Sequence, residues 1–198
     1  MTFGGLPTRF EPEGRSRGLA IVAPGRAYSP AAPLLELARL ALLQHDFTVQ
    51  QLWWDSTTRG EEDAEAWVRR HVAAAHAQEH ADHVLVVGKS LGTRAASYAA
   101  ELGLDAIWFT PILVDPIVAE GIAANAGRQL LVGGLADELW DAAVARELAD
   151  AGCQVLEVPD ADHGMGTPDV VRTAEIHLEV ARAVEAFLAQ LPEDLSQT

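Results

Sequence analysis

Cysteine and long apolar runs are the first things this sequence lacks. Cys153 is the only cysteine, so no disulfide can form within the chain. This usage fits a reducing compartment, and the apolar stretch C-Q-V-L-E-V around Cys153 favours a packing role for the thiol. No apolar run is long enough to cross a bilayer, and the first residues lack the basic and then apolar pattern of a secretory signal. We therefore expect a cytoplasmic protein without a membrane segment.

Positive charge is also scarce. The 14 Lys and Arg residues stand against 29 Asp and Glu residues, which gives a formal net charge of −15. A surface of that sign repels phosphate backbones and disfavours anionic membranes. We expect neither nucleic acid nor a membrane as a partner, and solubility is the simplest role for the acidity.

Glycine-rich nucleotide-binding patterns are missing as well. There is no Walker-type loop, and no G-x-G-x-x-G follows the first predicted strand, which disfavours a nucleotide-binding protein. Internal repeats, linkers and low-complexity segments are absent too. With 198 residues, 49% of them hydrophobic, the chain suits one domain over residues 1–198. Residues 1–16 and 192–198 are expected to be loosely held ends.

What the sequence does contain is a regular alternation of short apolar runs and longer segments of helical periodicity. This alternation predicts an α/β fold, a three-layer α/β/α sandwich with a mostly parallel sheet. The run H-V-L-V-V-G over 83–88 is the most hydrophobic and is expected at the centre of the sheet. The expected strands are 18–23, 47–53, 83–88, 106–109, 129–132 and 153–158, and the expected helices are 33–44, 61–79, 91–102, 114–124, 138–151 and 170–191.

A serine flanked by glycines follows the predicted central strand. Residues 88–92 read G-K-S-L-G, which matches G-x-S-x-G, and a helical pattern begins directly after Ser90. The motif requires a turn so tight that the serine hydroxyl projects above the sheet, where side chains at Gly88 and Gly92 would clash with neighbouring elements. The alternative is a glycine-rich strand-to-helix turn with an incidental serine. The strand–turn–helix context favours Ser90 as a nucleophile.

A hydroxyl needs a base to become a nucleophile, and the base in turn needs an acid. In such folds both follow the serine in chain order, each after a later strand. Asp137 in G-G-L-A-D-E-L-W-D and His163 in P-D-A-D-H-G-M-G occupy these places. Asp137 also suits the N-cap of the helix predicted over 138–151, and His163 could be an ordinary loop histidine. The rival acids are Asp115, Asp141, Asp160 and Asp162, with Asp115 the foremost.

Together these residues resemble the α/β-hydrolase superfamily, from Gly18 to Leu191. The segments A-P-G-R-A-Y-S-P-A-A-P-L-L and A-I-W-F-T-P-I-L are similar to small dienelactone-hydrolase-like members. The resemblance implies a carboxylesterase-like serine hydrolase with the triad Ser90, Asp137 and His163 and no cofactor. Two departures stand out. Pro24-Gly25-Arg26 replaces the His-Gly of many esterases, and the short segment before Gly18 leaves room for one opening antiparallel strand or none.

The resemblance also implies an oxyanion hole made by the backbone N–H of Leu91 and a second N–H from the 25–27 turn, for which Arg26 is the first choice. Pro24 cannot donate because it lacks an N–H. Tyr28 at the site mouth and Trp140 just beyond Asp137 are candidate substrate-binding residues, although Tyr28 could equally be a solvated loop residue. Lys89 is assigned no catalytic role, and Trp108 is expected to pack in the core.

The connection 111–128 is too short to carry a lid, so no cap domain is expected. The site should be open and shallow, which favours a small-molecule acyl substrate. A cysteine-based dienelactone hydrolase is excluded because residue 90 is serine. The second hypothesis is a non-catalytic binding or scaffolding protein of the same fold. His76, His80 and His83 form a weak histidine cluster, and we expect no metal site. The oligomeric state is left open.

Overall fold

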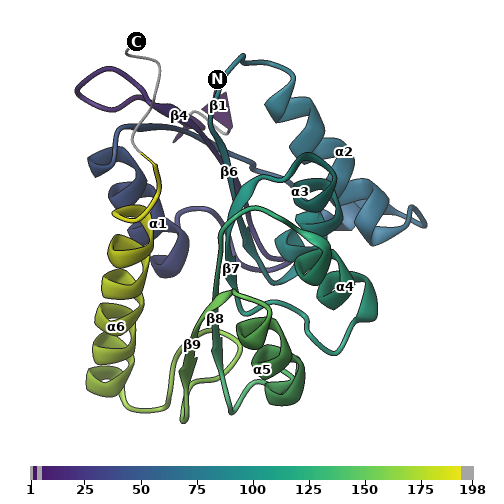
Figure 1. Cartoon of the computed structure of the whole chain (residues 1–198), viewed down its shortest axis with the longest axis vertical. Coiled ribbons are helices and arrows are strands. Elements are labelled where there is room, and N and C mark those ends of the chain that lie inside the picture. Colours follow the sequence, from purple (N-terminus) through teal and green to yellow (C-terminus); the bar gives the residue numbers. More distant parts are fainter. Residues whose placement is uncertain (1, 4–5, 193–198) are drawn as a thin grey trace.

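The computed structural model describes residues 2–3 and 6–192 of the chain (Figure 1). Two short strands, β1 (Thr2–Phe3) and β2 (Leu6–Pro7), pair with each other. The main sheet has seven strands: β3 (Arg9–Phe10), β4 (Gly18–Ala23), β5 (Phe47–Gln51), β6 (Val84–Lys89), β7 (Asp105–Phe109), β8 (Gln129–Gly134) and β9 (Gln154–Val158). Their spatial order is β3-β5-β4-β6-β7-β8-β9, and only β3 runs antiparallel to its neighbour.

Helices cover both faces of this sheet. α1 (Pro33–Gln44) and α6 (Val170–Leu188) lie together on one face, at the left of Figure 1. The other face carries α2 (Ala64–His76), α3 (Ala96–Leu102), α4 (Pro116–Ala124) and α5 (Ala142–Asp150), with two short 3₁₀ helices, η1 (Ser56–Arg59) and η2 (Ser90–Ala95). The predicted three-layer sandwich, its mostly parallel sheet and the central place of the strand at 84–89 are confirmed.

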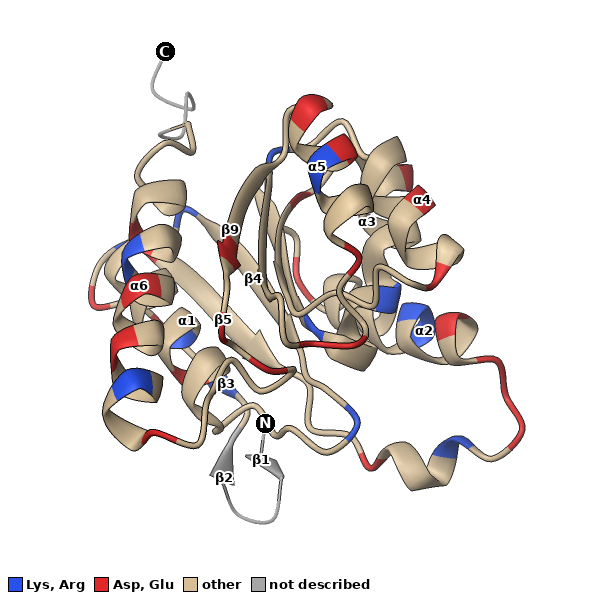
Figure 2. Cartoon of the chain, turned by 90° about the horizontal axis from the view of Figure 1, so that it is seen from below, with Lys and Arg blue, Asp and Glu red and all other residues tan. Residues whose placement is uncertain are grey.

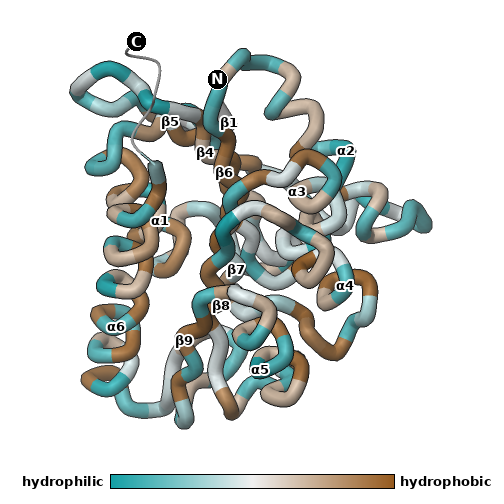
Figure 3. Tube along the Cα trace, viewed as in Figure 1, coloured by the Kyte–Doolittle hydropathy of each residue, from teal (hydrophilic) through white to brown (hydrophobic). Residues whose placement is uncertain are grey.

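The core forms two layers because successive side chains of a strand point to opposite faces. On β6, Leu85 and Val87 pack towards α1 and α6, whereas Val84 and Val86 pack towards the helices of the other face. Figure 3 shows the resulting hydrophobic centre along β6, β7 and β8, with hydrophilic stretches on the outer helices. Trp108 is fully buried on β7, as expected. Cys153 packs at the edge of the core, and burial raises the pKa of its thiol, which fits the expected packing role.

Several element boundaries differ from the expected ones. The segment after Ser90 first forms a 3₁₀ helix and becomes α-helical only at Ala96, because the chain leaves the strand through a tight turn. The helix expected over 138–151 begins at Ala142, and its N-cap is Asp141, whose carboxylate accepts the N–H of Ala143. The role of Asp137 as helix cap, left open above, is therefore wrong.

Part of the N-terminal segment pairs with the main sheet. β3 pairs antiparallel with β5, and the N–H of Gln51 donates to the carbonyl of Thr8 at 2.7 Å. Arg9 forms an ion pair with Glu79, three residues beyond the end of α2. β3 is thus the one opening antiparallel strand for which the segment before Gly18 left room. Residues 1, 4–5 and 193–198, within the ends expected to be loosely held, lie outside the described part of the chain.

The charged residues lie mainly on the helices and loops, where Figure 2 shows most of the red and blue segments. Among the described residues, none of the helices combines the length and apolar character that a bilayer crossing needs.

Candidate active site

The turn at Ser90 is as tight as the motif predicted. Ser90 has a φ of +51°, in the left-handed region that non-glycine residues seldom adopt. A Cβ at Gly92 would lie 2.0 Å from the carbonyl oxygen of Ala23, and a Cβ at Gly88 would lie 2.8 Å from the Trp108 ring. Both glycines are therefore required by close approach to neighbouring elements. The strain at Ser90 is held by the packing of η2 against β4.

The loop that carries His163 is fixed from within. The Asp162 carboxylate accepts the N–H groups of Gly164 at 2.8 Å and of Gly166 at 3.0 Å. Met165 has a φ of +57° and is fully buried in the core beneath α6. The Asp162 carboxylate and the buried Met165 side chain thus restrain the loop on either side of His163, which limits the movement of its backbone.

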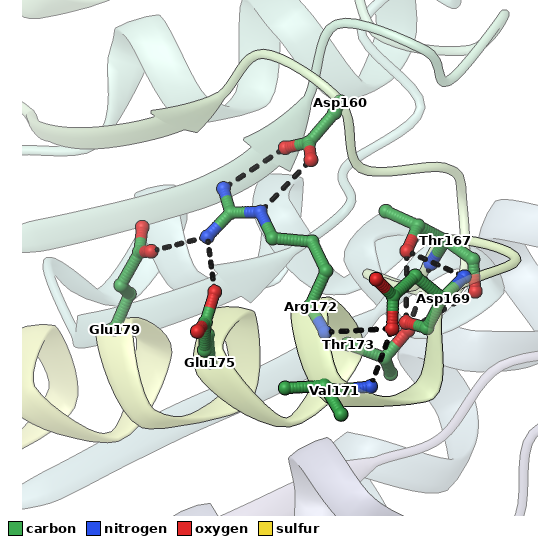
Figure 4. A network of polar contacts seen from close by, with 8 residues as sticks. All are labelled: Asp160, Thr167, Asp169, Val171, Arg172, Thr173, Glu175 and Glu179. Atoms are coloured by element: carbon green, nitrogen blue, oxygen red, sulfur yellow. Dashed lines mark hydrogen bonds and ion pairs between the residues drawn. The ribbon is translucent and has the colours of Figure 1, made fainter.

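A second set of contacts ties the start of this loop to α6 (Figure 4). Arg172 pairs with both carboxylate oxygens of Asp160, at 2.8 and 2.9 Å, and also contacts Glu179 at 2.9 Å and Glu175 at 3.6 Å. The guanidinium lowers the pKa of Asp160. Because these groups are partly exposed to water, each ion pair adds little to the stability of the fold. The network instead fixes the position of the loop relative to α6.

The structure brings Ser90, His163 and Asp137 together at the carboxyl edge of the sheet. Ser90 Oγ lies 2.8 Å from His163 Nε2, and His163 Nδ1 lies 2.7 Å from Asp137 Oδ2. The Asp137 side chain is 1% exposed and the His163 side chain 35%. The other Asp137 oxygen accepts the N–H of Leu139 at 2.9 Å. The three residues follow β6, β8 and β9, whose carboxyl ends share one edge because the strands are parallel.

The rival acids are engaged elsewhere. Asp115 caps α4 and pairs with Arg94, and Asp141 caps α5. Asp160 binds Arg172, and Asp162 accepts the backbone N–H groups of its own loop. Among the described carboxylates, that of Asp137 alone contacts the imidazole of His163.

Lys89, to which the sequence assigned no role, is buried beside this chain of hydrogen bonds. Lys89 is 2% exposed, and its ammonium donates to the carbonyl of His163 at 2.7 Å and to Thr110 Oγ1 at 2.8 Å. Burial lowers the pKa of Lys89 to about 8, against the opposing effect of Asp137 and Asp162. Strand alternation was the available signal, since Lys89 follows Leu85 and Val87 onto the same face.

The turn after β4 lies against the serine, as the proposed oxyanion hole requires. A Cβ at Gly25 would be 3.5 Å from the Cβ of Ser90. Arg26 is exposed and its carbonyl accepts from Ser56 Oγ at 3.2 Å, while no described residue accepts the Arg26 N–H in a hydrogen bond. Leu91 is buried directly after Ser90. An N–H at residue 26 is thus free to bind a ligand atom.

The two expected substrate-binding side chains have other contacts. Trp140 is 7% exposed, packs over Gly133 and donates its indole N–H to Glu157 at 2.7 Å, so most of its surface is in contact with the protein itself. The Tyr28 hydroxyl accepts the N–H of Leu34 at 3.0 Å, at the start of α1. Tyr28 therefore lies near the site, and its hydroxyl links the turn after β4 to α1.

Ser90 and His163 are both partly exposed. Four cavities formed by the described residues lie elsewhere and have neither of these residues in their walls. In the expected histidine cluster, His76 contacts Tyr98 at 2.8 Å and His83 contacts Asp105 at 2.9 Å. The described part of the chain holds no group of three or more His, Cys, Asp or Glu placed to bind a metal ion.

Comparison with known proteins gives similarity in structure only. No family model matches the sequence, and no curated protein matches it. Est1E from Butyrivibrio proteoclasticus, also solved with ferulic acid bound, superposes with a TM-score of 0.72 at 13% identity over 92% of each chain. An alpha/beta-superfamily protein from Xanthomonas campestris pv. campestris gives 0.69 at 22% identity, over 88% of this chain and all of its own.

The esterase domain of a Rhodothermus marinus protein gives a TM-score of 0.64 at 14% identity, over 91% of this chain and 89% of that one. These likenesses cover nearly the whole chain, and they agree with the strand order and with the layers of helices. The chain therefore has the fold of a small α/β-hydrolase.

Proposed function

We propose that this protein is a serine hydrolase that cleaves an ester, thioester or similar acyl bond of a small substrate through an acyl-enzyme. The observation that carries the proposal is the unbroken contact chain from Asp137 through His163 to Ser90, with distances of 2.7 and 2.8 Å. Both lie within the range expected for a working acid–base–nucleophile set. One structural neighbour is the esterase domain of the Rhodothermus marinus protein, which supports the same class of reaction.

In the first half of the reaction, His163 Nε2 takes the proton of the Ser90 hydroxyl while Oγ attacks the acyl carbon. The carbonyl double bond opens and leaves a negative charge on its oxygen. Asp137 accepts the hydrogen bond from His163 Nδ1 and stabilises the imidazolium that forms. When the tetrahedral species collapses, the leaving group takes the proton from His163, and the acyl group stays on Ser90.

In the second half, water attacks the acyl carbon and gives its proton to His163. Collapse of this second tetrahedral species releases the acid and returns the proton to Ser90 Oγ. The His163 side chain is 35% exposed, so it is accessible to the water that the second half requires.

The oxyanion formed in both halves needs two donors, which we assign to the N–H groups of Leu91 and Arg26. Replacing Arg26 by proline removes the second N–H, so we expect kcat/KM for a short p-nitrophenyl ester to fall about 100-fold, as for loss of one oxyanion donor. Arg26→Ala is the matched control, because it removes the side chain and keeps the N–H. Equal losses in the two variants would instead place the role in the guanidinium.

The partial exposure of Ser90 and His163 supports a small or extended substrate over a deeply buried one. The connection between β7 and β8 contains only α4, which leaves no cap above the site. Binding therefore relies on few enclosing contacts, and acyl groups of short length are the first substrates to try.

Labelling with a fluorophosphonate tests the proposal directly. We expect the folded protein to take up one label per chain, at Ser90 out of six serines, and the unfolded protein to take up none. Peptide mass analysis locates the label. Ser97→Ala is a control, since Ser97 on α3 contacts Glu65 away from the site, and it should label like the native protein. A folded protein that takes no label would favour a non-catalytic binding protein.

A further inference from the structure

Lys89 is the only lysine in the chain. The other 13 of the 14 basic residues are arginines, which shows that this sequence meets its need for surface cations without lysine. The one lysine stands inside the serine turn and is among the largest fully buried side chains of the protein. A compact ammonium on a flexible stem differs from a planar guanidinium in the geometry of its donors.

The Lys89 ammonium has two hydrogen-bond acceptors and an aromatic ring around it. It donates to the carbonyl of His163 at 2.7 Å and to Thr110 Oγ1 at 2.8 Å, and it lies 5.0 Å from the centroid of the Tyr28 ring. These partners follow three different strands, namely β9, β7 and β4. The lysine thus joins the loops that surround Ser90.

No described carboxylate is in direct contact with this ammonium. The titratable groups that face it are Tyr28 after β4, Asp137 after β8, and Asp162 and His163 after β9, and the two aspartates act on it through space. Burying a cation without a contacting carboxylate is unfavourable for folding. Methionine would fill the same space without that penalty, so stability alone does not favour a lysine here.

We propose that Lys89 is a positioning residue, which holds the main chain of His163 through its carbonyl and thereby keeps the imidazole between Ser90 and Asp137. The inference rests on the proposed hydrolase function. The contact at 2.7 Å is made to the backbone of the very residue whose ring must stay within hydrogen-bond reach of two partners. A misplacement of about 1 Å at such a site lowers rates about 100-fold.

Two substitutions separate positioning from packing. Lys89→Met keeps most of the length and removes every donor. Lys89→Gln keeps an N–H donor, one bond closer to the main chain than the lysine Nζ, and removes the charge. Arg146→Met is the control for the change in net charge, because Arg146 is exposed on α5. Each variant is first checked for folding by thermal unfolding.

The first measurement is inactivation by a fluorophosphonate, with the maximal rate separated from the half-saturating concentration. Lys89→Met should lower the maximal rate about 100-fold and leave the half-saturating concentration unchanged. Lys89→Gln should react about tenfold faster than Lys89→Met. Arg146→Met should react like the native protein. A folded Lys89→Met variant that reacts within threefold of the native rate would overturn the proposal.

The second measurement is the low-field proton resonance of the hydrogen bond between His163 Nδ1 and Asp137, identified by its absence in His163→Ala. We expect it to vanish in Lys89→Met and to return in Lys89→Gln. This resonance does not depend on hydrolase activity, so it decides the role of Lys89 even if the native protein takes no label. Its persistence in Lys89→Met, or failure of both lysine variants to fold, would make Lys89 a structural residue and refute the positioning role.

Discussion

Replacing Ser90 by alanine should lower the turnover of a short p-nitrophenyl ester about 10⁶-fold, and His163→Ala should do the same. The double variant should lose no more than either single one. The physical reason is that the two residues move one proton between them, so either is useless without the other. Rates under single-turnover conditions, corrected for the reaction in buffer alone, measure this non-additivity.

Asp137→Asn extends the same prediction to the acid. The amide cannot hold the imidazolium or fix its tautomer, and we expect a loss of about 10⁴-fold in kcat with little change in KM. Asp115→Asn and Asp141→Asn are matched controls, because these carboxylates cap α4 and α5. They should change stability by less than about 1 kcal/mol, because asparagine caps a helix about as well as aspartate, and should leave turnover within a few-fold.

Other patterns of loss would contradict this scheme. If the losses at Ser90 and His163 multiplied in the double variant, the two residues would act independently, and the contact at 2.8 Å would not carry the proton. If Asp115→Asn lost more activity than Asp137→Asn, the acid would have to come from the strand before β8. The first outcome would call for a different nucleophile or base, and the second for a different acid.

Gly92→Ala should lower the free energy of unfolding by more than about 4 kcal/mol, among the largest effects of any single methyl group. The added Cβ would lie 2.0 Å from the carbonyl oxygen of Ala23 and 2.6 Å from its carbonyl carbon. Neither atom can retreat, because Ala23 ends β4, which pairs with β5 on one side and β6 on the other. Urea unfolding followed by circular dichroism measures the loss.

Gly14→Ala is the control for this experiment. Gly14 is exposed, and its added Cβ would meet only the end of the flexible Asp46 side chain, at 3.3 Å. We expect a change below about 0.5 kcal/mol there. A Gly92→Ala protein as stable as Gly14→Ala would mean that η2 shifts away from β4 at little cost. Fluorophosphonate labelling of Ser90 would then report whether the serine still has its strained backbone.

Much of the fold and the order of the candidate triad could be predicted from sequence. The periods of apolar residues distinguish strands from helices locally, and a parallel sheet then brings the ends of separate strands to one edge. The glycines around Ser90 were also informative, because a position that has no space for a Cβ must be glycine. His163 and Asp137 followed from chain order and from their places after late strands.

Side-chain contacts between segments far apart in the chain could not be predicted from such local patterns. Trp140 and Tyr28 were expected to meet a substrate, but they pack on Gly133 and on the start of α1. The sequence offered Asp137 as the N-cap of the following helix, but that helix begins at Ala142 and its N-cap is Asp141.

The sequence by itself determined the layers of this protein, the strained serine turn and the order of three polar residues, because each depends on local periodicity or on the size of a side chain. The tertiary structure alone decided which carboxylate meets His163, and that Lys89 is buried against the histidine's carbonyl. Those contacts join residues 26 and 74 positions apart in the chain, and their geometry is set by the packing of the whole sheet.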